Sequence, residues 1–237
     1  FVPSRGLGDV YKRQVRVCDS MSCRMAGAEN LIQELDHKFD ESIRVQRVPC
    51  VGRCQHAPVA VVGQNPVDLA NPVKVQQKSE LNDTIPSLPD YVDYNAYRTA
   101  GGYQVFQFCI KGERQPKEVI EVLKNSNLRG LGGAGFPAGM KWDIVRKFEG
   151  TRLLAVNIDE GEPGTFKDRY FLESDPHRFL EGCLIACWAV GIEEIYLYLR
   201  DEYAACRTLL LKELEALKKD PPEKLPKIHL RRGAGAY

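Results

Sequence analysis

The chain has 237 residues, of which 43% are hydrophobic and 27% are charged, enough apolar material for one large domain or two small ones. Its 33 basic and 32 acidic side chains nearly cancel, so the composition lacks the basic surplus typical of proteins that bind nucleic acid. No apolar run approaches the roughly 20 residues that span a bilayer. We therefore expect neither a nucleic-acid partner nor direct insertion into a membrane.

The first part of the chain predicts a small α/β domain. Residues 1–14 lack the apolar core of a secretory signal and are interpreted as a leader or a cloning scar. Strands are expected at 14–18, 43–48 and 58–63, and apolar residues recur at helical spacing from Ala28 to Phe39. The resulting β-α-β unit is assigned to residues 15–80. A stretch rich in Pro, Asn and Asp follows, and residues 81–115 are interpreted as a linker.

Four of the eight cysteines form two closely spaced pairs in this first domain. Four residues separate Cys18 from Cys23, and three residues separate Cys50 from Cys54. Each pair follows a predicted strand, so a β-α-β fold can bring four thiolates around a pair of irons. Zinc is the chemical alternative, although zinc ribbons usually have two-residue gaps. Clustered thiols without an export signal also favour a reducing, cytoplasmic location.

Residues 116–237 predict a second α/β domain with a largely parallel sheet. Strands are expected at 152–157, 194–199 and 227–232, and helices at 116–124, 175–191 and 202–218. Cys183 and Cys187 lie four positions apart on an apolar helix and are expected to be core residues. His56, His177 and His229 are expected to be structural or surface groups.

A glycine-rich loop, "GLGGAGFPAG", opens this second domain. Gly130, Gly132 and Gly135 match a dinucleotide fingerprint, but that fingerprint needs a strand before its first glycine, whereas the preceding segment reads as a helix. The Gly-Lys-Ser/Thr ending of a Walker loop is also missing. The acidic pair Asp159-Glu160 closes a strand a little over 20 residues downstream, as a ribose-binding carboxylate would, so the fingerprint stays one interpretation beside a mobile connector and a cradle for phosphate. Backbone without side chains approaches a ligand closely, and Lys141 adds positive charge near the start of the next helix.

Polar side chains gather after the strand at 152–157. The segment "NIDEGEPG" places Asn157, Asp159, Glu160 and Glu162 at the carboxyl end of that strand, where open parallel sheets hold ligands. An amide and three carboxylates so close together suit a ligand with hydroxyl groups and ring nitrogens, such as a flavin. Taken alone, this pattern is only suggestive.

The motifs "GLGGAGFPAGMKW", "NIDEGEPGTFKDR", "DPHRFLEG" and "GAGAY" closely resemble the FMN- and NADH-binding flavoprotein subunit of respiratory complex I and its relatives in NAD-dependent formate dehydrogenases and NAD-reducing hydrogenases. The resemblance covers roughly residues 94–237. It implies a complex I flavoprotein-type α/β FMN-binding domain that is not a true Rossmann fold. In that family an acidic segment, a linking domain and a domain with a [4Fe–4S] cluster follow, so we expect the chain to be an incomplete fragment that is inactive alone.

The resemblance also implies roles for individual residues. The FMN would contact Gly130, Gly132 and Lys141 within a cradle that includes Gly133 and Gly135, and Asn157, Asp159 and Glu160 would bind its ring and ribityl chain. Tyr237 would lie at the phosphate, and Phe136 and Glu162 would face the nicotinamide nucleotide. Leu131 and Ile144 depart from the family, which often has Arg and an aromatic residue there, and this leaves the details of dinucleotide affinity open.

The context "PCVGRCQHAPVAVVG" resembles the thioredoxin-like [2Fe–2S] ferredoxin domain that accompanies such flavoproteins. This implies that Cys18, Cys23, Cys50 and Cys54 hold a [2Fe–2S] cluster, with zinc or an empty domain as alternatives. The expected function is an NADH/NAD+ diaphorase subunit in which Glu162 positions the nicotinamide, most consistent with the β subunit of a formate dehydrogenase. Complex I, an NAD-reducing hydrogenase, and a non-catalytic electron-relay module are the alternatives. Expected partners are a molybdenum- or tungsten-containing iron–sulfur subunit or the electron-accepting subunits of complex I.

Overall fold

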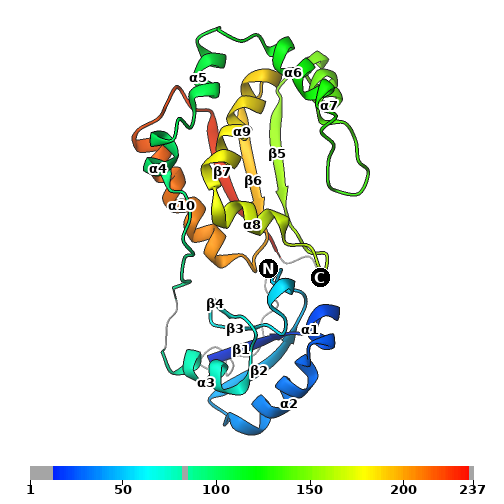
Figure 1. Ribbon diagram of the computed structural model, residues 1–237, viewed down its shortest axis with the longest axis vertical. Helices are drawn as coiled ribbons and strands as arrows, with labels where there is room; N and C mark the ends of the chain where they lie inside the picture. Colours follow the sequence, from blue (N-terminus) through cyan, green and yellow to red (C-terminus); the bar gives the residue numbers. More distant parts are fainter. Residues whose placement is uncertain (1–12, 82–84, 235–237) are drawn as a thin grey trace.

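Two separate sheets organise the chain, one in each domain (Figure 1). The computed structural model describes residues 13–81 and 85–234. Of the leader predicted at 1–14, only Arg13 and Gln14 are described, and they begin the first strand. The predicted architecture, a thioredoxin-like domain followed by a flavoprotein-type α/β domain, is confirmed.

The first domain is built around a four-stranded sheet in the order β2-β1-β3-β4. Its strands are β1 (Arg13–Cys18), β2 (Ile43–Val48), β3 (Ala60–Val62) and β4 (Asn65–Val67). Strands β1 and β2 are parallel, whereas β3 runs antiparallel to both β1 and β4. Helix α2 (Ala28–Lys38) makes the crossover and buries Leu31, Ile32 and Leu35 against the sheet. The predicted β-α-β unit is therefore present.

Two short elements and one helix of this domain were not predicted. Strand β4, helix α1 (Met21–Met25) and helix α3 (Pro72–Glu80) are all short or rich in turn-forming residues. Pro72 occupies the first turn of α3, and the Asn71 side chain accepts a hydrogen bond from the Lys74 N–H at 3.0 Å. Proline and asparagine are thus helix-start signals here rather than loop signals.

The predicted linker at 81–115 contains two helices that pack on the second domain. They are α4 (Tyr94–Thr99) and α5 (Gln104–Ile110), and Tyr94, Tyr103 and Phe106 are buried in the second core. The buried Glu181 carboxylate accepts hydrogen bonds from the backbone N–H groups of Tyr103 at 2.9 Å and Phe106 at 3.2 Å. Residues 94–110 therefore belong structurally to the second domain.

The second domain has a parallel sheet in the order β5-β6-β7. Its strands are β5 (Leu153–Ile158), β6 (Glu194–Leu199) and β7 (Lys227–Arg232), and its helices are α6 (Pro116–Asn125), α7 (Ala138–Lys147), α8 (Lys167–Ser174), α9 (Pro176–Val190) and α10 (Ala204–Lys219). Every predicted strand and helix is present, and α8 was missed. Ile195, Leu197 and Leu199 of β6 are buried in one core with residues of α9 and α10.

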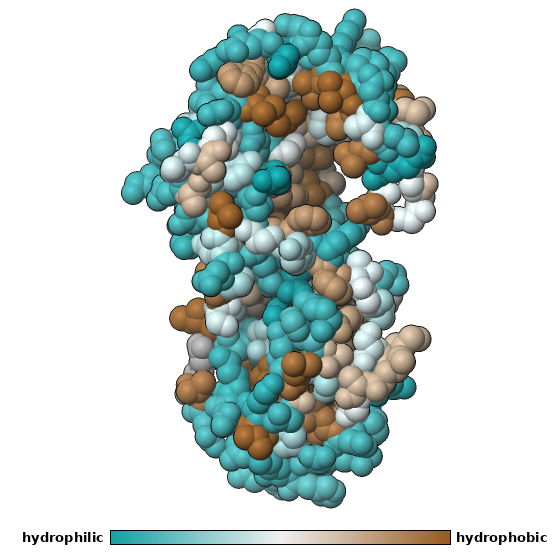
Figure 2. Space-filling model, in the orientation of Figure 1, coloured by the Kyte–Doolittle hydropathy of each residue, from teal (hydrophilic) through white to brown (hydrophobic). Residues whose placement is uncertain are grey.

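The sheet has a second face with less cover. Alternate residues of the strands point to this face, where Leu153, Ala155 and Asn157 are exposed and Tyr198 is 40% exposed. Apolar residues gather on the visible surface of the second domain near α6 and α7 (Figure 2). Those exposed on the glycine loop and α7 include Leu128, Leu131, Phe136, Met140 and Ile144. Among the described residues, no helix is long and apolar enough to cross a membrane.

Candidate functional site

The four predicted metal ligands lie together at one end of the first sheet. Cys18 is the last residue of β1, Cys23 lies in α1, Cys50 follows β2, and Cys54 opens a short 3-10 helix (Cys54–His56). The Sγ atoms of Cys50 and Cys54 are 3.3 Å apart, and the Cys18 thiol contacts both Cys23 and Cys50. None of the four is in a disulfide. The fold therefore joins the two sequence pairs, as the β-α-β argument predicts.

The number and pairing of these thiols fit a binuclear cluster. Among the described residues, no three Cys, His, Asp or Glu side chains converge on a point that would hold one metal ion. In a [2Fe–2S] cluster each iron takes only two protein thiolates, so pairwise contact is sufficient. Backbone N–H groups also donate to the sulfurs, from Gly52 to Cys50 at 3.4 Å and from Gly164 to Cys54 at 3.2 Å. Such bonds are a means of tuning iron–sulfur sites.

The pKa values of the cysteine thiols are shifted in different directions. The hydrogen bond with Cys18 and burial raise the pKa of Cys50, whereas the Cys18 hydrogen bond lowers the pKa of Cys23. Burial also raises the pKa of Cys54. Because metal ligands must be deprotonated, a metal that binds here displaces these protons and makes its affinity depend on pH.

The glycine loop has a closed base and an open tip. The Gly130 N–H donates to the Phe136 carbonyl at 2.9 Å, and the Ala138 N–H donates to the Leu128 carbonyl at 2.8 Å. Gly133 and Gly135 have left-handed φ angles of +94° and +61°, which favour glycine. A Cβ atom at either position, or at Gly132, would meet nothing within 4 Å. The open side of the loop is therefore accessible to a ligand, and helix α6, not a strand, precedes it.

Other residues predicted on this loop also lie at its surface. Phe136 is 43% exposed at the base of the loop, and Lys141 is exposed in the first turn of α7. Leu131 and Ile144, the two departures from the family, are 77% and 43% exposed. Gly139 has a packing role instead, because a Cβ there would lie 2.6 Å from the Lys124 backbone nitrogen of α6. Tyr237 lies outside the described residues.

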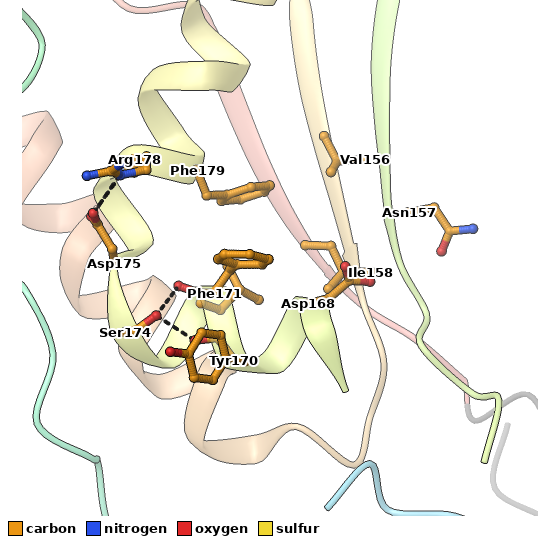
Figure 3. Close-up of a pocket in the computed structure, with 11 residues that line it drawn as sticks. Val156, Asn157, Ile158, Asp168, Tyr170, Phe171, Ser174, Asp175, Arg178 and Phe179 are labelled. Atoms are coloured by element: carbon orange, nitrogen blue, oxygen red, sulfur yellow. Dashed lines mark hydrogen bonds and ion pairs between the residues drawn. The ribbon is translucent and has the colours of Figure 1, made fainter. Parts of the chain in front are cut away.

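The polar residues after β5 divide into exposed and buried groups. Asn157 and Glu162 are exposed, Asp159 is half-buried, and Glu160 is buried. The Asn157 side-chain oxygen accepts a hydrogen bond from the Asp159 N–H at 2.9 Å, which holds the turn. The residues that line a cavity of about 440 Å³ beside α8 and α9 include Asn157, whose amide points away from the other labelled side chains (Figure 3). The aromatic side chains of Tyr170, Phe171 and Phe179 line that cavity. None of its lining residues belongs to the glycine loop.

Glu160 has its carboxylate fully engaged by the protein. It accepts hydrogen bonds from the backbone N–H groups of Asp168 at 2.9 Å and Arg169 at 3.3 Å, in the first turn of α8, and from the Tyr203 hydroxyl at 2.8 Å. A carboxylate there satisfies the free N–H groups and interacts favourably with the helix dipole. The FMN contact predicted for Glu160 stays a prediction, and the burial of its side chain favours a contact through the backbone.

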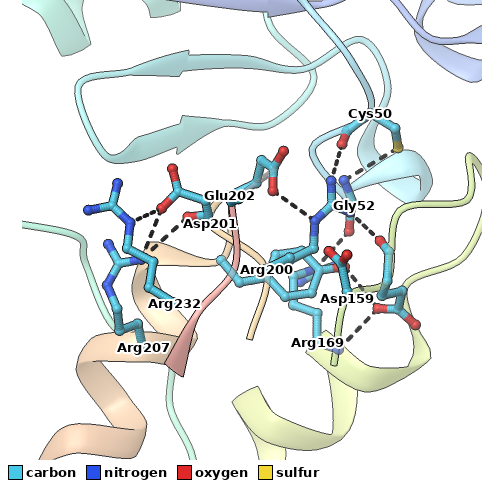
Figure 4. Close-up of polar contacts among 12 residues, drawn as sticks. Cys50, Gly52, Asp159, Arg169, Arg200, Asp201, Glu202, Arg207 and Arg232 are labelled. Atoms are coloured by element: carbon cyan, nitrogen blue, oxygen red, sulfur yellow. Dashed lines mark hydrogen bonds and ion pairs between the residues drawn. The ribbon is translucent and has the colours of Figure 1, made fainter. Parts of the chain in front are cut away.

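The two predicted sites meet at a polar junction between the domains (Figure 4). Arg200 donates to the Cys50 carbonyl at 2.6 Å and to the Glu160 carbonyl, and Arg169 donates to the Gly52 carbonyl at 2.9 Å. Both arginines are buried, with 3% and 4% exposure. Arg200 and Tyr203 were not predicted as site residues, because the run "LRDEY" at the end of β6 reads as an ordinary charged turn. Arg169 was not predicted because it lies in α8, a helix that the sequence pattern did not reveal.

Comparison with known proteins agrees with this geometry. Residues 7–80 match the family model of the thioredoxin-like [2Fe–2S] ferredoxin, and residues 123–237 match the Nuo51 FMN-binding domain. Taken together, the two matches cover most of the chain, which is therefore similar to a thioredoxin-like [2Fe–2S] ferredoxin domain joined to a Nuo51-type FMN-binding domain. The matched ranges include the four paired cysteines, the glycine loop and the acidic segment after β5.

Curated relatives of this chain include subunits of NADH-quinone oxidoreductase. One such subunit of Rhizobium meliloti (strain 1021) is 40% identical over 159 residues, which cover 63% of this chain and 38% of the relative. The corresponding NADH-quinone oxidoreductase subunit of Aquifex aeolicus (strain VF5) is 42% identical over 151 residues, or 60% of this chain and 34% of the relative. The match thus spans little more than a third of these relatives' length.

A solved structure extends the similarity across both domains. A chain of an NAD+-reducing [NiFe]-hydrogenase, in the H2-reduced state, superposes with a TM-score of 0.77 and 25% identity. The superposition covers 95% of this chain and 43% of that one.

Proposed function

We propose that the chain is part of a diaphorase subunit that moves hydride between a nicotinamide nucleotide and FMN and passes single electrons to or from a [2Fe–2S] cluster. The observation that carries this proposal is the hydrogen bond from the Gly164 N–H to the Cys54 sulfur at 3.2 Å. It joins the loop of the predicted flavin residues to a predicted cluster ligand. Two redox sites built on touching loops suit electron transfer between them.

The described residues provide a surface suited to FMN. The open glycine loop offers backbone close to a ligand, and the exposed Asn157 amide offers a donor and an acceptor at the end of β5. FMN, when bound, supplies the conversion between two-electron hydride transfer and one-electron transfer. The chain's own groups bind and orient the reactants, and we assign the exposed Glu162 to positioning the nicotinamide. No side chain is required as a nucleophile.

The cysteine site fits the second cofactor. Four thiols in mutual contact and two N–H donors to sulfur are the donor set of a [2Fe–2S] cluster. Zinc, which four thiolates also suit, remains the chemical alternative. A further [4Fe–4S] cluster, expected from the family resemblance, stays a prediction.

The finer assignment is to the β subunit of an NAD-dependent formate dehydrogenase acting in the cytoplasm with a molybdenum- or tungsten-containing partner. The sequence of the glycine motif, "RGLGGAGFPAG", and the joined ferredoxin domain support this assignment over a subunit of complex I. The hydrogenase chain matches over both domains as well, so the joined domain does not separate formate dehydrogenase from hydrogenase. A subunit of complex I is the other candidate of this class.

The direct test uses the full-length protein with its native partners, purified without oxygen. NADH-dependent reduction of ferricyanide measures the diaphorase reaction, and formate, hydrogen and a quinone are then offered in turn as the second substrate. We expect diaphorase activity together with formate-dependent NAD+ reduction. Activity with hydrogen or quinone instead would reject the formate assignment, and a protein with a cluster but no flavin reduction would be a relay module.

A further inference from the structure

A single buried guanidinium joins the two predicted redox sites. Arg200 follows β6 directly and is 3% exposed. Its Nη2 donates to the Cys50 carbonyl at 2.6 Å, and its Nη1 donates to the Glu160 carbonyl. Cys50 is a predicted cluster ligand, and Glu160 belongs to the predicted flavin segment. One side chain therefore fixes the spacing between backbone segments that lie in different domains.

The charge of this guanidinium is only partly balanced. Its Nε donates to the Glu202 carboxylate at 3.0 Å, and Glu202 is 22% exposed on its side chain. Arginine stays protonated in proteins, so Arg200 carries a full positive charge beside the loop of Cys50. Solvent screens the partly exposed Glu202 more than it screens the buried Arg200. Arg200 therefore places a buried positive charge beside the cysteine loop.

A second buried arginine supports the same loop from the same domain. Arg169 donates from Nε to the Gly52 carbonyl at 2.9 Å and pairs with Glu173 at 2.6 Å. Its close partner Glu173 is one turn along the same helix. Arg200 differs from Arg169 because its two terminal nitrogens donate to the carbonyls of Cys50 and Glu160, which lie in different domains.

We propose that Arg200 is a positioning residue that couples the two predicted redox sites. Its buried charge raises the reduction potential of the cluster held by Cys50. Its two terminal nitrogens hold the cysteine loop against the segment that contains Glu160. The inference rests on the proposed function. Reduction of a [2Fe–2S] cluster adds one negative charge, which a nearby buried cation stabilises. Loss of the cation therefore makes reduction harder.

The test is a redox titration of the cluster, followed by EPR, in the full-length protein reconstituted without oxygen. Arg200→Gln should shift the one-electron reduction equilibrium at least tenfold toward the oxidised cluster, a fall of about 59 mV in midpoint potential. Arg200→Lys keeps the charge and should restore most of that shift. Glu202→Gln removes the balancing anion and should move the potential upward. A purely structural role for Arg200 does not predict that the midpoint potential falls in Arg200→Gln and rises in Glu202→Gln.

Arg232→Gln is the matched control, because Arg232 pairs with Asp201 at the same junction but is 64% exposed on its side chain. Its removal changes net charge equally and should leave the potential within the error of the titration. An unchanged potential in Arg200→Gln with an intact EPR signal would overturn the inference alone. If Arg200→Gln takes up no iron, an unchanged or lower potential in Glu202→Gln overturns it. A wild-type protein that takes up no iron would instead overturn the proposed function.

Discussion

The ring of Tyr203 occupies the space that a side chain at Gly52 would need. Gly52 lies in the cysteine loop of the first domain, and a Cβ atom there would overlap the Tyr203 hydroxyl and ring carbons. The backbone of Gly52 has a left-handed φ of +70°. The same tyrosine donates its hydroxyl hydrogen to Glu160 at 2.8 Å. Close approach of the two domains thus depends on the absence of a side chain at one position between two predicted cluster ligands.

Gly52→Ala should weaken the docking of the two domains. Overpacking costs about 1–3 kcal/mol, in addition to roughly 1–2 kcal/mol for a left-handed alanine. Gly27→Ala is the matched control, because Gly27 has a φ of +93° but nothing within 4 Å of an added Cβ. Denaturant unfolding of both variants measures the difference. Equal losses of stability in Gly52→Ala and Gly27→Ala would show that the Tyr203 ring moves aside without strain.

The elements with strong periodicity could be predicted from the sequence. The strands of the second domain and helices α9 and α10 carry long apolar patterns, and the structure has them where expected. Strand β4 and helix α3 were missed because Pro66, Asn71 and Pro72 suggest turns when read singly. Helices α4 and α5 were missed because their cores depend on distant partners such as Glu181. The hydrophobic pattern of a short segment does not reveal contacts with residues that are distant in the sequence.

The candidate site was predictable only where chemistry is concentrated in short motifs. The cysteine spacing led to four thiols that do meet in the structure. The junction could not be predicted, because Arg200 meets Cys50 across 150 positions of sequence. For the same reason the buried role of the Glu160 carboxylate was not foreseen, since Tyr203 is 43 positions away. The roles of the glycine and acidic residues toward FMN stay predictions.

Glu213→Gln should destabilise the second domain in a pH-dependent way. The Glu213 carboxylate accepts hydrogen bonds from the Tyr91 hydroxyl, the Tyr94 N–H and His177 Nε2, at 2.7, 3.0 and 2.8 Å. Although burial alone would raise it, these hydrogen bonds bring the pKa of Glu213 below its ordinary value of 4.5. Stability from a lowered carboxyl pKa is present above the unfolded-state pKa and is lost as the pH falls through the folded-state pKa.

The loss at neutral pH should be about 1.5–3 kcal/mol, as for a hydrogen bond to a charged group. It should shrink below pH 4.5, where the wild-type carboxyl begins to take up its proton. Glu215→Gln, at an exposed position of the same helix, is the control and should change little. Unfolding curves collected from neutral to acidic pH give the comparison. A loss that stayed constant over that range would mean that the charge of Glu213 is not what matters.

Cys54→Ser should remove most of the bound iron from the first domain. The wild-type protein, reconstituted without oxygen, should hold about two irons in a [2Fe–2S] cluster with an EPR signal on reduction. Cys109→Ala removes a buried thiol of the second domain and should leave the iron content unchanged. Elemental analysis for iron and zinc, with EPR, decides between the metals. Stoichiometric zinc and no iron uptake would reject the cluster.

Glu162→Gln should slow hydride transfer more than it weakens FMN binding. The residue is exposed on the turn after β5, where the Thr165 N–H donates to its backbone carbonyl at 3.0 Å, so the turn itself should survive the substitution. Loss of its charge should reduce the rate of flavin reduction by NADH, because the side chain is assigned to positioning the nicotinamide. A fall of about tenfold would correspond to roughly 1.4 kcal/mol of transition-state stabilisation.

Stopped-flow reduction of the full-length protein by NADH, with its FMN content measured in parallel, separates the two effects of Glu162→Gln. Glu113→Gln is the control, because Glu113 is exposed after α5 and its loss changes the net charge equally. The control should reduce its flavin at the wild-type rate. Loss of FMN in Glu162→Gln at an unchanged rate in the molecules that retain it would place Glu162 beside the flavin instead.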